Sequence, residues 1–296
     1  MTKFTIGFDI GGSSIKSVVI NEGKIVFKRS RTIQEINDVH KLAKQLSEMW
    51  GEINQRFKIG KKSLIGIAVA GVLDKNREIM LKGPNLSYLD GLNLKKIFTK
   101  YLKREILLEN DVNCFLLREK EKGVLKNIGS AFYLTLGTGV GGAILLDGKI
   151  YMGHNGSAGE VGHMLMGANN NVEFEDLAST KLLKKHLNFG AQATKKMADA
   201  GDKKALKILK IFGENLGVGI TNIINIYDPQ IVIIGGGCAQ LKKYLLPIVK
   251  KTVKSKAISV PTKKTEIIFI WRGTKSLFLG AEGAAIMAQN NKRIST

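Results

Sequence analysis

Residues 8–25 read FDIGGSSIKSVVINEGKI, and residues 134–150 read LTLGTGVGGAILLDGKI. Each stretch has an apolar strand, a turn of small residues, a second apolar strand and a tight EGKI or DGKI turn. The two GKI triplets lie about 125 residues apart, which is too long a period for a solenoid repeat. The repetition therefore predicts two copies of one domain, each presenting a glycine hairpin.

The first of these turns, within GFDIGGSSIK at residues 7–16, has two interpretations. The glycines could simply form a hairpin turn after a strand. Alternatively, backbone N–H groups in the turn, with a metal ion supported by Asp9, could hold an anionic group such as phosphate. Ligands commonly bind in the cleft between two domains, and two glycine loops facing one cleft favour a nucleotide site.

Strand-like and helix-like segments alternate along the whole chain, which indicates an α/β fold. Strands are predicted within residues 3–10, 15–20, 23–30, 64–71, 104–111, 130–151, 230–237 and 265–271. One helix is predicted to begin after a cap at Asp38. Further helices are predicted over 112–123, 176–188, 203–227, 241–256 and, at the end of the chain, 277–289. We expect an N-terminal domain of residues 1–112, completed by a closing helix at 280–296, and a C-terminal domain of residues 113–279.

The composition is that of a soluble globular protein long enough for two domains. The chain has 296 residues, of which 44% are apolar and 24% charged. The sequence has neither an apolar run of the ~20 residues that span a bilayer nor a signal peptide at its N-terminus. Cys114 and Cys238 fit a reducing compartment and have no metal-ligand spacing, so we expect a cytoplasmic protein that does not bind membranes.

The net charge of +21 raises the question of nucleic-acid binding. Only eight of the 46 basic residues are Arg, and the Lys residues are scattered along the chain. The densest group, LKKYLLPIVKKTVKSK at 241–256, is typical of a solvated helix face. We therefore expect no specific nucleic-acid partner, and we interpret the charge as a field that attracts anionic substrates such as nucleotides.

Five motifs occur in one order along the chain: DIGGSSIK (9–16), ENDVN (109–113), LGTGVGGAIL (136–145), GSAGEVGH (156–163) and YDPQIVIIGGG (227–237). With these motifs the chain resembles the ROK family of sugar kinases and repressors, within the actin-like ATPase superfamily. The resemblance implies two actin-like (ribonuclease H-like) α/β domains with a cleft between them. It also implies ATP and Mg²⁺ as cofactors, a hexose or N-acylhexosamine as phosphoryl acceptor, and a homodimer.

The resemblance assigns the glycine-rich motifs to the nucleotide. Asp9 would hold Mg²⁺ through water, and Lys16 would add a cation near the phosphates. The backbone at Gly11, Gly12 and Ser13 would bind phosphate, although the family usually has Thr where this chain has Ser13. The second phosphate loop would use Thr138 and Gly139, and the nucleoside would lie at Gly235, Gly236 and Gly237. For each glycine, a hairpin or bulge without a ligand is the alternative.

The resemblance assigns the catalytic step and the sugar to the remaining motifs. Asp111 would be the general base that takes the proton from a sugar 6-hydroxyl; by itself, an Asp at this position could equally be a helix N-cap. The expected sugar-binding residues are Gly71, Asn85, Asn110, Asp111, Glu160, His163 and Glu175. Ala70 stands where the family has Pro, which weakens the prediction for Gly71, and Glu175 could instead be a charged helix start.

One departure from the family concerns zinc. Many members bind a structural Zn²⁺ through the His of the GEVGH motif and three cysteines that follow it. Residues 164–179 read MLMGANNNVEFEDLAS and contain no cysteine, although thiolates are the soft ligands that such a site requires. We therefore expect no zinc site, and His163 would be released from that role.

The zinc-free segment also bears on the choice of sugar. It resembles that of N-acetylmannosamine kinases, and Asn169–Asn171 could supply polar partners for an acetamido group. N-acetylmannosamine is therefore the favoured substrate, and a glucokinase or a related glucoside or fructose kinase is the alternative. A sugar-responsive transcriptional repressor is a second class, but Asp9 leaves no room for a DNA-binding domain ahead of it, and the site residues are retained. A catalytically inactive sugar sensor is a third possibility.

Overall fold

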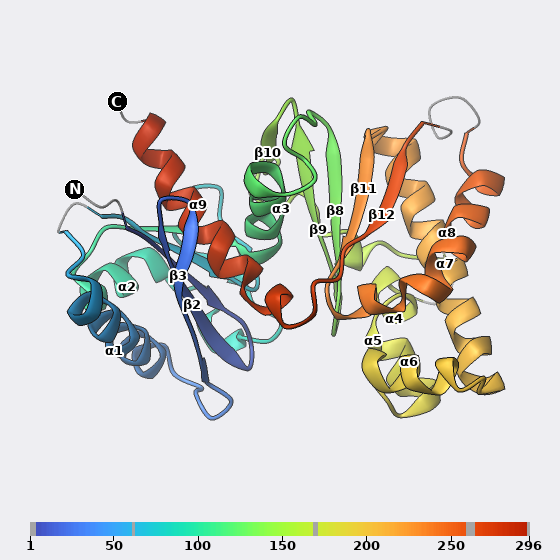
Figure 1. Ribbon diagram of the computed structural model, residues 1–296, viewed down its shortest axis with the longest axis horizontal. Helices are drawn as coiled ribbons and strands as arrows, with labels where there is room; N and C mark the ends of the chain where they lie inside the picture. The colour runs from blue at the N-terminus through green and yellow to red at the C-terminus, as the bar shows by residue number, and fades with distance from the viewer. Residues whose placement is uncertain (1–3, 61–62, 168–170, 259–263, 295–296) are drawn as a thin grey trace. The chain divides into compact units, whose positions relative to one another are not determined.

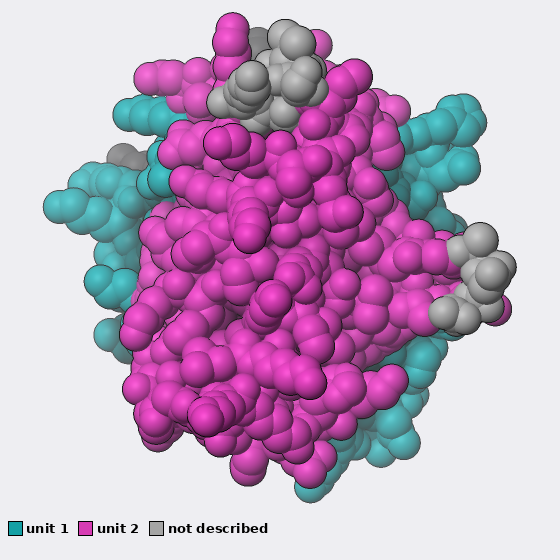
Figure 2. Space-filling model, turned by 90° about the vertical axis from the view of Figure 1, so that its right-hand side faces the viewer, with its two compact units in different colours: residues 1–126, 152–158, 274–296 teal, residues 127–151, 159–273 magenta. Residues whose placement is uncertain are grey.

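The computed structural model describes residues 4–60, 63–167, 171–258 and 264–294. The chain forms two compact units, which Figure 2 colours separately. Unit 1 comprises residues 1–126, 152–158 and 274–296, and unit 2 comprises residues 127–151 and 159–273. Each unit is built on its own five-stranded sheet (Figure 1).

The sheet of unit 1 has the order β3-β2-β1-β4-β7. Its strands are β1 (Thr5–Ile10), β2 (Ser14–Asn21), β3 (Lys24–Thr32), β4 (Ile65–Val69) and β7 (Ile106–Asn110). The first three form an antiparallel meander, whereas β1, β4 and β7 run parallel to one another. A small hairpin of β5 (Val72–Leu73) and β6 (Met80–Lys82) and a 3₁₀ turn at Ser87–Leu89 follow β4.

Successive side chains of a strand point to opposite faces, so the buried strands β1 and β4 have buried residues on both faces of the sheet. Helices cover both faces. Ile6, Phe8 and Ile10 of β1 pack in one core with α1 (Val39–Phe57) and α2 (Leu94–Leu102). The other face is covered by α3 (Asp111–Lys122) and α9 (Leu279–Ile294), and α9 lies beside the central strands (Figure 1). Here a Cβ on Gly66 would lie 1.8 Å from the carbonyl oxygen of Ala284, so this face requires glycine for the close approach of α9.

The sheet of unit 2 has the order β10-β9-β8-β11-β12, which repeats the connectivity of the first sheet. Its strands are β8 (Ala131–Leu136), β9 (Val140–Leu146), β10 (Lys149–Tyr151), β11 (Ile231–Gly235) and β12 (Glu266–Phe269). Again an antiparallel meander is extended by parallel strands. The duplicated hairpin domain that the sequence predicts is therefore confirmed.

The helices of unit 2 pack on this sheet in one core with Phe132, Leu134, Val232 and Phe269. They are α4 (Phe174–Leu177), α5 (Thr180–Leu187), α6 (Ala191–Asp199), α7 (Lys203–Tyr227) and α8 (Lys242–Lys256), with 3₁₀ turns at Val161–His163 and Gly237–Leu241. A further 3₁₀ turn, Gly273–Phe278, precedes α9.

Several details differ from the sequence-based expectations. The helix predicted over 176–188 is two helices, because Ser179 caps a new start at Thr180. Helices α2 and α6 were not predicted, and the N-cap Gly190 of α6 gives no side-chain signal. The division between the units falls after residue 126 rather than 112, because α3 packs against α9. Within the described ranges, none of the helices has both the length and the apolar content needed to cross a membrane.

Candidate active site

The predicted site residues of unit 1 lie at one edge of its sheet. Strands β1, β4 and β7 are parallel neighbours, and their register places Ile10 beside Val69 and Val69 beside Asn110. Asp9, Gly71 and Asp111 each lie within two residues of these positions. In open α/β sheets, ligands bind outside the carboxyl ends of such strands. The topology therefore gathers an acid, a glycine and an Asn–Asp pair at a typical ligand-binding edge.

Asp9 is a buried carboxylate that lies beside a cationic side chain. It is 5% exposed, and Lys16, its register partner on β2, places Nζ 3.8 Å from its Oδ2. Burial raises the pKa of Asp9, and the positive charge of Lys16 opposes the increase. A Cβ on Gly280 at the start of α9 would lie 2.7 Å from the Asp9 carboxyl, so this helix also approaches it closely.

Backbone hydrogen bonds fix the turn after Asp9. The N–H of Gly11 donates to the carbonyl oxygen of Ser14, at 3.1 Å, and so closes the turn. The carbonyl oxygen of Ser13 accepts from the N–H of Ile33, which anchors the turn. A Cβ on Gly12 would lie 2.7 Å from the Cβ of Asn85, so the turn contacts this predicted sugar ligand directly.

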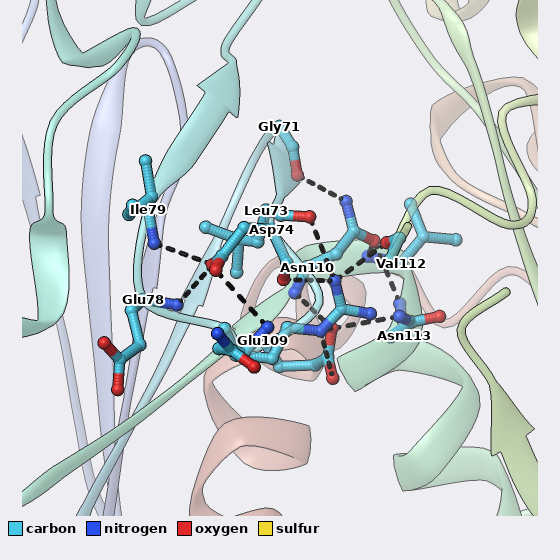
Figure 3. Close-up of polar contacts among 12 residues, drawn as sticks. Gly71, Leu73, Asp74, Glu78, Ile79, Glu109, Asn110, Val112 and Asn113 are labelled. Carbon is cyan, nitrogen blue, oxygen red and sulfur yellow. Dashed lines mark hydrogen bonds and ion pairs between the residues drawn. The ribbon is translucent and has the colours of Figure 1, made fainter. Parts of the chain in front are cut away.

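Asn110, rather than Asp111, caps helix α3. Its Oδ1 accepts from the N–H groups of Val112 (2.8 Å) and Asn113 (3.2 Å), and its Nδ2 donates to the carbonyl oxygen of Gly71 (3.0 Å), as Figure 3 shows. Asp111 is the first residue of the helix. Since Asn110 supplies the cap, the alternative that Asp111 is the N-cap is wrong. Gly71 has φ +152°, and a Cβ there would lie 2.6 Å from the carbonyl oxygen of Lys82.

The buried thiol of Cys114 lies in the electrostatic field of the carboxylates around the start of α3. Its thiol is fully buried, and its pKa lies well above the usual value. Burial is the main cause, and the negative charges of Glu109, Asp9 and Asp111 add to it in that order. The positive charge of Arg77 opposes this increase.

Sequence reasoning missed Glu109 and Arg77. Glu109 is buried beneath the turn that carries Asp111, and its carboxylate accepts from the N–H of Asn110, from Nδ2 of Asn113 and from Nε of Arg77 (Figure 3). Glu109 lies inside the ENDVN motif, so its position was a signal. Nothing in the sequence links it to Arg77, which is 32 residues away.

Unit 2 brings the second glycine loop and the triple glycine together. Thr135 of β8 pairs with Gly235 of β11, so the turns that follow these parallel strands lie at the same edge. A hollow of about 650 Å³ lies there. It is lined by Gly137, Thr138, Thr180, Gly190, Ala191, Gln192, Ala193, Lys196, Gly237 and Gln240. This volume is within the usual range for a small-molecule site.

Glycine is required at Gly236. Its φ is +80°, and a Cβ would lie 2.5 Å from the carbonyl oxygen of Leu136, immediately before the 137–139 turn. The residues at 191–196 belong to α6, so the sequence analysis could not associate them with the hollow.

His163 is held by a carboxylate that the sequence analysis did not assign. Its Nδ1 lies 3.0 Å from Oε2 of Glu173. A carboxylate only accepts hydrogen bonds, so Nδ1 carries the proton and Nε2 is directed elsewhere. Partial burial raises the pKa of Glu160; His163 opposes this increase, and the Glu175 charge adds to it. These three predicted sugar residues are therefore electrostatic neighbours.

Glu175 faces the second glycine loop. Its Oε2 accepts from the N–H of Val140 at 3.2 Å, and a Cβ on Gly139 would lie 2.3 Å from the same oxygen. Its Oε1 pairs with Nζ of Lys181 at 2.5 Å. Of the Asn169–Asn171 group, the first two residues lie outside the described residues. Within the described ranges, no three His, Cys, Asp or Glu side chains are grouped as a metal site would require.

Comparison with known proteins identifies relatives over almost the whole chain. Residues 5–291 match the family model described as the ROK family. An uncharacterised protein of Clostridium perfringens is 32% identical over 88% of this chain and 90% of its own length. An N-acetyl-D-glucosamine kinase of Vibrio cholerae is 29% identical (84% of this chain, 94% of its own). A xylose repressor of Bacillus subtilis is 27% identical (96% of this chain, 77% of its own).

Solved structures share the fold. A glucokinase of Streptomyces griseus in complex with glucose and AMPPNP superposes with a TM-score of 0.83 at 22% identity, covering 97% of this chain and all of that one. A proposed N-acetylmannosamine kinase of Listeria monocytogenes gives a TM-score of 0.81 at 23% identity, covering 98% of this chain and all of that one. The two-domain actin-like fold expected from the sequence is confirmed by these similarities.

Proposed function

The chain belongs to the ROK family, and on that premise we propose that it is an ATP-dependent sugar kinase acting on the 6-hydroxyl of a hexose. The observation that carries the proposal is the edge of the unit 1 sheet, where Asp9, Gly71 and the Asn110–Asp111 turn follow three adjacent parallel strands. Phosphoryl transfer requires positioned phosphates, charge neutralisation and a base near the attacking hydroxyl. This edge offers residues of each type.

Asp111 is the proposed general base. It would accept the proton of the sugar 6-hydroxyl as that oxygen attacks phosphorus. Its place in the first turn of α3 supports this role, because the cap at Asn110 fixes the backbone on either side of it. Asn110 also reaches Gly71, so the hydroxyl-binding Asn, the close-approach glycine and the base form one connected unit.

Asp9 and the glycine turn that follows it are the proposed phosphate and magnesium site of unit 1. When bound, ATP supplies the phosphoryl group and Mg²⁺ neutralises phosphate charge. The residues fit these groups: Asp9 is a hard oxygen ligand, and Lys16 beside it adds a positive charge for the phosphates. The N–H groups of Gly12 and Ser13 would bind phosphate, with Gly11 closing the turn.

In unit 2, Thr138 and Gly139 would bind phosphate, and Gly235, Gly236 and Gly237 would adjoin the nucleoside. The hollow beside Thr138 and Gly237 supports this assignment.

The sugar-binding set comprises Asn85 and Gly71 in unit 1, and Glu160, His163 and Glu175 in unit 2. The Glu173 contact supports His163 in this role, because it fixes the tautomer and leaves Nε2 for a hydroxyl. The contacts of Glu175 with Val140 N–H and Lys181 mean that it must exchange partners if it is to reach the anomeric end of a sugar.

We favour N-acetylmannosamine as the substrate, with glucose and related hexoses as the alternative. The segment after His163 has no cysteine, and the zinc loop of other members is replaced by Glu173 as the partner of His163. The similarity to an N-acetyl-D-glucosamine kinase also supports an acetamido sugar. A pocket that hydrogen-bonds the amide can reject a sugar without that amide by ~10⁴-fold. A pocket that only has space for the acetamido group discriminates between the two sugars by ~10–200-fold.

The test is a comparison of kcat/KM for N-acetylmannosamine, N-acetylglucosamine, glucose and mannose, measured by ADP release. We expect N-acetylmannosamine to lead. If glucose leads by about tenfold or more, the acetamido preference is wrong and the enzyme is of the glucokinase type. If no sugar in an extended panel is phosphorylated, the kinase proposal itself fails.

A sugar-responsive repressor is the second candidate, and the similarity to the xylose repressor favours it. The retained Asp9, Asp111 and GTGVGG loop support the kinase instead. We further propose a cytoplasmic homodimer. Buried, unpaired thiols at Cys114 and Cys238 support a reducing compartment, and the dimer rests on the family alone and is testable by light scattering.

A further inference from the structure

Arg77 occupies a position that carries several energetic costs. Its φ is +56°, in the left-handed region that non-glycine residues rarely adopt. Its charged side chain is only 11% exposed, and Nη2 is buried without a hydrogen-bond partner among the described residues. Such violations of local preference concentrate at functional sites.

The turn that holds Arg77 in this conformation is built by Asp74. The Asp74 carboxylate accepts from the N–H groups of Glu78 (2.7 Å) and Ile79 (2.8 Å), and its carbonyl oxygen accepts from the N–H of Arg77. The turn, which Figure 3 shows beside the start of α3, therefore aims the Arg77 side chain inward despite the cost to its backbone.

The guanidinium contacts both the strand end that precedes the Asp111 turn and the 152–158 segment. Nε lies 3.0 Å from Oε1 of Glu109, the carboxylate that holds Asn110 and Asn113 on either side of Asp111. Nη1 donates to the carbonyl oxygen of Gly156 at 2.8 Å. The 152–158 segment runs directly into Glu160 and His163 of the GSAGEVGH motif.

Gly156 is shaped for this contact. Its φ is +89°, and a Cβ there would lie 2.9 Å from the carbonyl oxygen of Leu73 and 3.0 Å from Nη1 of Arg77. The segment therefore packs closely against the turn that presents Arg77, and one side chain contacts both Glu109 and the 152–158 segment.

We propose that Arg77 is a positioning residue for catalysis, acting through Glu109 on the Asp111 turn and through Gly156 on the 152–158 segment. This inference rests on the proposed kinase function. Misplacing a catalytic group by about 1 Å can cost roughly 10²-fold in rate. Removal of the guanidinium should therefore lower kcat while the KM for ATP stays close to that of the parent.

The test uses Arg77→Gly, which removes the side chain and also relieves the backbone strain, so that strain cannot explain a loss. We expect kcat to fall about 10- to 100-fold. Arg77→Lys keeps the charge but not the planar fork, so it should restore part of the rate. Lys75→Ala is the matched control, since Lys75 lies exposed in the same turn; it should behave as the parent.

A double-mutant cycle with Glu109→Gln tests the route of the effect. If Arg77 acts through Glu109, the double variant should lose much less than the product of the two single losses. Strictly multiplicative losses would overturn the route through Glu109.

Hydrogen exchange gives a readout that does not depend on activity. In Arg77→Gly, the amides of residues 110–113 and of 152–158 should exchange at least several-fold faster, with the strands of unit 2 unchanged. A parent protein inactive on every sugar would refute the kinase function, and exchange alone would then decide whether Arg77 braces these segments. An active parent whose Arg77→Gly variant keeps kcat within threefold overturns the positioning role. If Arg77→Gly does not fold, the same criteria apply to Arg77→Asn, since Asn tolerates the positive φ of this position.

Discussion

At the scale of single residues, the carboxylates around the start of α3 have distinct environments. Asp9 is buried beside one lysine, Glu109 is paired with Arg77, and Asp111 lies in the first turn of a capped helix. We therefore propose a different role for each carboxylate: Asp9 would support a metal, Glu109 would position the turn, and Asp111 would act as the base. The roles can be separated by single substitutions.

Asp111→Asn removes the proposed base while keeping the shape of the side chain. We expect kcat to fall by about two to four orders of magnitude, with ATP and sugar binding retained. Calorimetric binding and steady-state kinetics on the purified variant provide the measurement. Asp147→Asn, in the DGKI turn at φ +49°, is the control and should match the parent, since Asn tolerates this conformation. Turnover within threefold of the parent would exclude Asp111 from the role.

Asp74 should make stability depend on pH. Partial burial alone would raise its pKa, but the N–H groups of Ile79, Glu78 and Asn76 outweigh this effect and hold the pKa below the ordinary value of 3.8. A folded-state pKa below that of the unfolded chain means that the ionised group stabilises the fold above pH 3.8. That contribution is lost as the pH falls through the lowered pKa.

Asp74→Asn keeps an acceptor oxygen but loses the charge, so it should be less stable than the parent near pH 7 by about 0.5–1.5 kcal/mol. The difference should shrink as the pH falls below 3.8. Urea denaturation over a pH series measures it. A difference that stays constant down to pH 2 would contradict the electrostatic origin.

At the scale of elements, helix α9 depends on small residues and on a buried ion-pair cluster. Gly66 on β4 and Gly7 on β1 allow the helix backbone to approach the sheet. Glu282, which is 7% exposed, pairs with Arg118 (3.1 Å) and Lys122 (3.3 Å) of α3. These contacts join the end of the chain to unit 1, although more than 150 residues separate α3 from α9.

Gly66→Ala should strongly destabilise unit 1, because its Cβ would lie 1.8 Å from the Ala284 carbonyl oxygen. We expect a loss of about 1–3 kcal/mol or more, as for overpacked cores. Gly51→Ala, inside α1 with open space around the added Cβ, should instead stabilise by about 0.5–1 kcal/mol. Thermal or urea denaturation of the pair decides, and equal effects at the two sites would refute the close-packing argument.

At the scale of the whole molecule, the charge of +21 is spread over the surface of many elements. Lysines lie on α5, α6, α7 and α8 as well as in unit 1. A dispersed positive field attracts anions, including DNA, but it does not distinguish one base sequence from another. It therefore does not by itself favour a repressor over a kinase.

We expect DNA binding to be weak, independent of sequence and steeply reduced by salt, because it would come only from counterion release. Gel-shift assays between 50 and 200 mM salt test this, with a scrambled duplex as the control. A salt-resistant shift that depends on sequence would revive the repressor candidate.

We also expect the protein to fold and function without zinc. Residues 164–179 contain no cysteine, and His163 pairs with Glu173. Elemental analysis after dialysis against a chelator should find far less than one zinc per chain, with activity retained on added Mg²⁺. One zinc per chain, lost together with activity, would contradict this expectation.

The sequence by itself determined the duplicated architecture. Apolar strands, glycine turns and the repeated GKI triplets are local signals, so they predicted the paired hairpins that became β1–β2 and β8–β9. Apolar periodicity after Asp38 likewise predicted α1, because a cap and a helical face can be seen within one segment. Motif order identified the family for the same reason, since each motif is contiguous.

Only the tertiary structure decided which distant residues meet. Arg77 with Glu109 and Gly156, His163 with Glu173, and Glu175 with Val140 are contacts that no periodicity encodes. The division of the chain after residue 126 also depends on the packing of α3 against α9. The physical reason is that a strand or turn depends on a few residues that are neighbours in the sequence. A contact between distant side chains depends on how two separate segments pack in the folded protein.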